Sequence, residues 1–79
     1  MEQKNIIGLR IRIARLAEIP VCTQKDLSAR LDILGVHLSD KALSKIELGR
    51  QEVTDYQVVA LAKALKVNIL WLLGENQDL

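Results

Sequence analysis

The sequence predicts an all-α protein built from five short helices. Apolar residues make up 49% of the 79 residues and Phe is absent, so the core must be Leu, Ile, Val and Ala, which suits helix-on-helix packing. Apolar residues recur at spacings of three and four in successive segments. Four of these segments follow a good N-cap residue. We therefore expect one small domain over residues 1–79.

The first two helices are separated by a proline. Within residues 2–19, Ile7, Ile11 and Ala14 share one helical face, and Pro20 ends the helix. The second helix begins after Thr23 as N-cap. Its capping-box position holds an aspartate, and a glycine at position 35 ends it.

The third helix lies in the segment "SDKALSKIELGR" at 39–50. Ser39 is its expected N-cap and Gly49 its expected C-terminal stop. Leu43 and Ile46 are three residues apart, so they share a buried face. The remaining side chains, many of them charged, then form an outer edge.

Two further helices complete the chain. Thr54 and Gln57 form a capping box for a helix within residues 53–67. Its core stripe consists of Val58, Leu61, Ala62 and Leu65. Asn68 caps a last short helix, "ILWLLG". The second and third helices together cover about residues 23–48, and a short connection joins them. This is the arrangement of a helix-turn-helix.

Composition excludes several classes of protein. One cysteine, Cys22, cannot form an internal disulfide, and Cys22 with the lone His37 is too small a set for a metal site. No apolar run in the sequence is long enough to cross a membrane, so we expect a cytoplasmic protein. No nucleophile motif or phosphate-binding loop motif occurs, so we expect neither an enzyme nor a bound cofactor. Residues 1–50 hold nine Lys and Arg against six Asp and Glu, whereas residues 51–79 hold two against four. This asymmetry is a weak indication of an anionic partner.

The chain resembles the XRE-type helix-turn-helix family of phage Cro and repressor proteins. The matching segments are "IGLRIRIAR" at 7–15, "TQKDLSARL" at 23–31, "LSKIELGR" at 43–50 and "LAKALKVNILWLLG" at 61–74. The resemblance implies a five-helix, lambda-repressor-like domain that binds double-stranded DNA, usually as a dimer. The connections "LAEIPVC" and "DILGVH" are longer than the family usually has.

The resemblance also assigns residues to DNA contacts. It implies that base edges are contacted by Asp40, Lys41, Ser44 and Lys45. It implies that phosphates are contacted by Gln24, Lys25 and Arg50. The alternatives are a plain solvated helix face for the first group, a helix-dipole role for Asp40 and an ordinary polar helix start for Gln24.

Two structural predictions remain. By resemblance, Arg15 and Glu47 form a partly buried ion pair that ties the first helix to the third. A second apolar stripe is formed by Leu9, Ile13 and Leu16, and Leu70 and Trp71 add apolar area on the last helix. The five residues are either a wide core or an exposed dimer interface.

The function expected from the sequence is a DNA-binding transcriptional regulator, most often a repressor, that binds a palindromic operator as a homodimer. A partner regulator could control it, as in restriction-system controllers and antitoxin-type regulators. The rival hypothesis is a protein-interaction module that has kept the fold.

Overall fold

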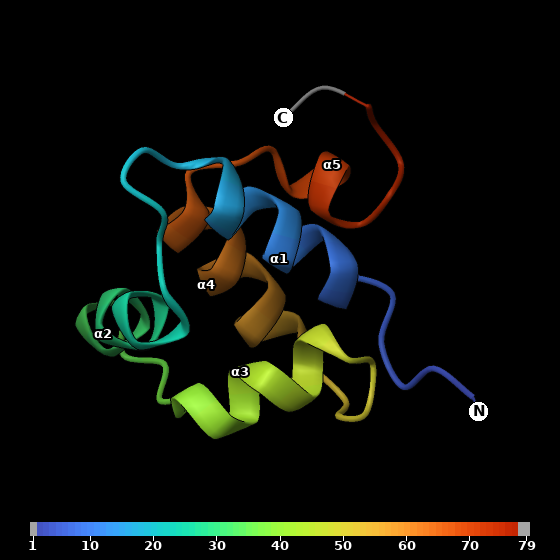
Figure 1. The fold of residues 1–79 in the computed structure, drawn as a ribbon. Helices are drawn as coiled ribbons and strands as arrows, with labels where there is room; N and C mark the ends of the chain where they lie inside the picture. The colour runs from blue at the N-terminus through green and yellow to red at the C-terminus, as the bar shows by residue number, and fades with distance from the viewer. Residues whose placement is uncertain (1, 78–79) are drawn as a thin grey trace.

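The computed structural model describes residues 2–77 and contains five helices within them (Figure 1). The helices are α1 (Gly8–Ala17), α2 (Gln24–Ile33), α3 (Asp40–Glu47), α4 (Asp55–Leu65) and α5 (Ile69–Leu72). No strand occurs in the described residues. The all-α prediction is therefore confirmed, with α2 and α3 packed together as a helix-turn-helix.

The predicted caps form at the starts of the last four helices. Thr23 accepts a hydrogen bond from Asp26 N and Thr54 accepts one from Gln57 N, each within a complete capping box. Ser39 caps α3 and Asn68 caps α5 through their side-chain oxygens. Because a cap satisfies N–H groups that the helix leaves free, these residues fix where each helix begins.

The first helix is shorter than the sequence predicted. It begins at Gly8, and residues 2–7 are not helical. The Asn5 side-chain oxygen accepts hydrogen bonds from the backbone N–H groups of Ile7 and Gly8, at 3.0 and 2.8 Å. Asn5 thus caps the helix from three residues before its start, and the chain ahead of it runs instead toward the end of α3.

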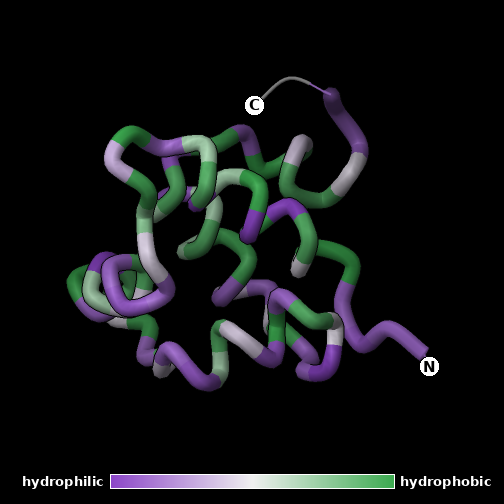
Figure 2. The backbone as a smooth tube through the Cα atoms, in the orientation of Figure 1, coloured by the Kyte–Doolittle hydropathy of each residue, from purple (hydrophilic) through white to green (hydrophobic). Residues whose placement is uncertain are grey.

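The core is aliphatic and lies where all five helices meet. Figure 2 shows apolar segments on each helix and hydrophilic segments along the N-terminal arm and at the lower edge, where α3 lies. Sixteen buried hydrophobic residues form one cluster. It includes the predicted stripes of α1 and α4, except that Val58 is only partly buried. The core packs against the face of α3 that carries Leu43 and Ile46, and the opposite face of the helix is exposed.

Candidate nucleic-acid interface

Helix α3 presents a cationic surface opposite its buried face. Leu43 and Ile46 are fully buried, whereas Lys41 and Lys45 are exposed and Ser44 is half-buried. Neither lysine has an ion-pair partner anywhere in residues 2–77. Unpaired ammonium groups on a rigid helix are suited to bind an external anion or the acceptor edge of a base.

The start of α3 uses its acidic residue locally. The Asp40 carboxylate accepts a hydrogen bond from the backbone N–H of Lys41, at 3.0 Å, and Ser39 accepts one from Ala42 N, at 3.1 Å. A carboxylate in the first turn also interacts favourably with the helix dipole. Asp40 therefore has a structural role at the helix start, and its second carboxylate oxygen makes none of the hydrogen bonds seen in the described residues.

A buried bidentate ion pair fixes the other end of α3. Arg15 Nε lies 2.7 Å from Glu47 Oε2, and Nη2 lies 2.8 Å from Oε1. The side chains are 8% and 3% exposed. Arg15 Nη1 also donates to the Cys22 carbonyl at 2.9 Å, so one guanidinium joins α1, α3 and the chain before α2. The hydrogen bonds that Arg15 donates to the Glu47 carboxylate raise the pKa of the guanidinium.

Two further contacts hold the same end, and the sequence did not predict either. The Asn5 amide donates to the carbonyls of Ile46 and Gln51, at 3.0 and 2.9 Å, while its oxygen caps α1. Gly8 packs so closely on α3 that a Cβ there would collide with the carbonyl oxygens of Ile46 and Glu47. The signal in the sequence is an Asn three residues ahead of a glycine at a helix start.

The predicted phosphate-contacting residues lie at the surface of the helix-turn-helix. Gln24 is the first residue of α2 and is half-buried, whereas Lys25 and Arg50 are exposed. Lys4 is a candidate that the sequence did not suggest. Its backbone N–H donates to the carbonyl of Gly49 at 2.9 Å, so this exposed lysine lies in the chain next to Arg50.

The proposed apolar patch needs one correction. Trp71 is 6% exposed and its ring packs against Arg10, whose guanidinium carbon lies 5.1 Å from the ring centroid. Arg10 also donates to the Trp71 carbonyl at 2.9 Å. Trp71 is therefore a core residue and is not available as an exposed anchor. The other four are 45–69% exposed, and we name Leu9, Ile13, Leu16 and Leu70 the α1–α5 patch.

No group of three or more potential metal-ligating side chains occurs in residues 2–77. His37 Nδ1 lies 2.8 Å from Asp32 Oδ1, and both side chains are exposed. Cys22 is buried, and its loss of solvent raises the pKa of the thiol. None of the helices in the described part of the chain has the length and apolarity to span a bilayer.

The fold and the exposed third helix define a helix-turn-helix DNA-binding domain. The model of the helix-turn-helix family matches residues 22–72, from the chain before α2 to the end of α5. This match covers more than half of the chain, and the protein belongs to the XRE-type helix-turn-helix family. Neither a curated protein nor a solved structure matches the chain significantly.

Proposed function

We propose that this protein is a transcriptional repressor that recognises a specific duplex DNA sequence through α3. The observation that carries the proposal is the contrast between the two sides of this helix. One side is locked to α1 by the buried Arg15–Glu47 pair, and the other exposes Lys41 and Lys45 with no partner among residues 2–77. A rigid helix with free donors on its outer face is what reading the major groove requires.

The individual roles follow from the chemistry of each group. Lys41 and Lys45 donate to the O6 and N7 acceptors of guanine, and Ser44 donates to or accepts from a neighbouring base edge. Asp40 accepts from cytosine N4 with its second oxygen. The phosphates on either side are held by Gln24, Lys25 and Arg50, which set the register of the protein on the duplex.

Repression and dimerisation are linked in this proposal. An eight-residue helix touches few bases, so one copy has little specificity. A homodimer on a palindromic operator presents two third helices to successive major grooves and roughly doubles the contacts. Such a dimer represses in the cytoplasm by occupying promoter DNA, and a partner regulator could displace it. From the sequence, the α1–α5 patch is one candidate surface for the dimer contact, and this candidate stays a prediction.

Two alanine variants distinguish a residue that recognises base edges from a residue that contacts phosphates. Lys45→Ala should weaken binding to the specific site by about 1–3 kcal/mol and relax the base preference at one position. Arg50→Ala should weaken specific and nonspecific DNA alike and make the salt dependence shallower. The assay is a titration of selected and scrambled duplexes at several salt concentrations. Equal losses on both duplexes for Lys45→Ala would exclude a base-reading role.

The second candidate function is a protein-interaction module. The α1–α5 patch favours it, because Leu9, Ile13 and Leu16 on α1 and Leu70 on α5 are large apolar side chains that are exposed. Ionic strength discriminates between the two functions. Binding to DNA weakens steeply as salt rises, since counterions are released from phosphates, whereas association through aliphatic side chains changes little.

A further inference from the structure

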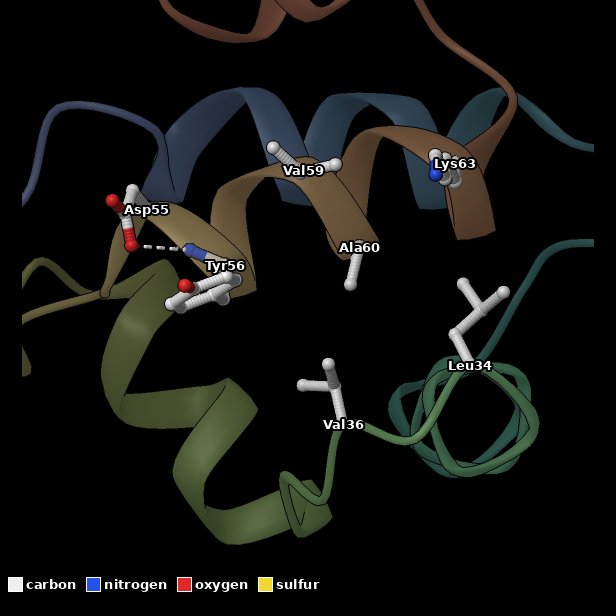
Figure 3. Close-up of a pocket in the computed structure, with 7 residues that line it drawn as sticks. All are labelled: Leu34, Val36, Asp55, Tyr56, Val59, Ala60 and Lys63. Atoms are coloured by element: carbon white, nitrogen blue, oxygen red, sulfur yellow. Dashed lines mark hydrogen bonds between the residues drawn. The ribbon is translucent and has the colours of Figure 1, made fainter.

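An apolar hollow of about 490 Å³ runs along the outer side of α4 (Figure 3). Its apolar walls are formed by Leu34, Val36, Tyr56, Val59 and Ala60. Two more hollows adjoin it, and Val59 lines all three. The outer side of α4 is therefore a crest with apolar depressions on both sides, and Tyr56 on this crest is 82% exposed.

The ends of this hollow carry opposite charges. Asp55 lies at the start of α4 and Lys63 in its last turn, and Figure 3 shows them at the two ends of the same helix. Neither forms an ion pair within residues 2–77. Eight residues of helix separate them, about 12 Å along the axis, and Val59 lies at the midpoint.

This spacing makes the surface complementary to itself. If two copies of α4 pack antiparallel with their Val59 residues at a two-fold axis, Asp55 of each copy faces Lys63 of the other. The crest of one copy then enters the depression beside the crest of its partner, as ridges pack into grooves between helices. A two-fold interface requires such self-complementarity, because the same patch serves on both sides.

The same axis suits a DNA-binding dimer. In Figure 3, α4 runs across the view with α3 below it, and α1 packs against α4 from behind. A two-fold axis perpendicular to α4 and directed toward α3 makes the two α4 helices antiparallel. It also keeps both copies of α3 on one side of the assembly, where a single duplex can meet them.

We propose that a second copy of this chain docks on the α4 crest, with reciprocal ion pairs between Asp55 and Lys63. This inference rests on the proposed function and names the surface through which its dimer forms. The four residues of the α1–α5 patch are all aliphatic, so no charge among them can fix the orientation of a partner. The α4 crest has an apolar centre, and the charges of Asp55 and Lys63 at its two ends can fix how two copies align. The crest belongs to a single helix of 11 residues, so we expect the dimer to be weak and operator DNA to strengthen it.

Charge reversal tests this geometry directly. In sedimentation without DNA, Lys63→Glu alone and Asp55→Lys alone should each weaken self-association roughly 10- to 100-fold, because two attractive pairs become two repulsive ones. An equimolar mixture of the two variants should recover association as a mixed dimer, since each then faces its opposite charge. The double variant should also recover association.

Controls exclude loss of folding and the competing surface. Both charges complement the dipole of α4, so thermal unfolding of every variant is measured, and Asp55→Asn with Lys63→Gln provides a milder pair. Ile13→Lys alters the α1–α5 patch and should leave self-association unchanged. Binding of each folded variant to a half-site duplex reports on the DNA contacts of one copy, without dimerisation, and should equal that of the wild type.

Three results would overturn the proposal. They are a wild type that stays monomeric at hundreds of micromolar, a mixture of the two reversal variants that stays monomeric, and an Ile13→Lys variant that dissociates. If the wild type still binds the half-site duplex, none of these three results contradicts the proposed DNA binding. Loss of half-site binding in the wild type would instead refute the proposed function itself.

Discussion

Replacing Arg15 with alanine would leave the Glu47 carboxylate buried without a cation beside it. The wild-type guanidinium donates two hydrogen bonds of 2.7 and 2.8 Å to this carboxylate, and the Glu47 side chain is 3% exposed. Loss of one partner of such a pair costs about 3–5 kcal/mol, mainly because the remaining charge stays desolvated. This is a large part of the roughly 5–15 kcal/mol by which a domain is stable.

Urea and thermal unfolding measure this loss. We expect the melting temperature to fall by about 4–8 °C for each kcal/mol in a domain of this size. Arg30→Ala is a matched control, because Arg30 forms the same bidentate pair with Glu18 at side-chain exposures of 36% and 30%. Arg30 also donates to the Ala64 carbonyl, so this variant should lose about 1–2 kcal/mol.

A double variant separates the charge from the packing. Replacing Arg15 with Met and Glu47 with Leu removes both charges and refills the space, so it should cost less than Arg15→Ala alone. The reasoning fails if Arg15→Ala unfolds at the wild-type urea concentration or costs no more than Arg30→Ala. It also fails if the double variant is less stable than Arg15→Ala.

Two further predictions concern close packing and acid stability. Gly8→Ala should destabilise the fold by about 1–3 kcal/mol or more, measured by urea unfolding, because the new Cβ meets the carbonyl oxygens of Ile46 and Glu47; a neutral variant would contradict this packing. Hydrogen bonds from Arg30 lower the pKa of Glu18, so the pair contributes fully above the unfolded-state pKa of about 4.3 and is lost as pH falls through the lower folded-state pKa. Glu18→Gln should flatten the fall in unfolding free energy below about pH 4, and an unchanged slope would argue against the pair.

The helix starts could be predicted from the sequence because caps are local. The side chains of Thr23, Ser39, Thr54 and Asn68 each bond to a backbone N–H two or three residues ahead, so a short window contains the whole interaction. The start of α1 was missed because its cap, Asn5, also bonds to residues more than forty positions away. Such a residue looks like an ordinary loop asparagine in the sequence.

Contacts between residues far apart in the sequence could not be predicted from local patterns at the candidate site. Arg15 and Glu47 are 32 residues apart, and only the family resemblance suggested their pairing before the structure showed it. The sequence leaves Trp71 open between a core position and an exposed interface, because its helix, α5, has only four residues and shows no clear face. Arg10 of α1 packs against the Trp71 ring and helps to bury it. The two residues are 61 positions apart, so a local sequence pattern could not predict this contact.

The polar contacts that tie α3 to α1 and to the chain before α1 lie at the C-terminal turn of α3. Asn5 bonds to the Ile46 carbonyl, Arg15 bonds to the Glu47 carboxylate and Gly8 packs against both residues. Lys41, at the other end of the helix, makes none of these three contacts. Changes at residues 41, 44 and 45 should therefore alter the surface that we propose to meet DNA without removing these contacts. If that proposal holds, the base preference of the protein can be redesigned, or can drift in evolution, at little cost to its stability.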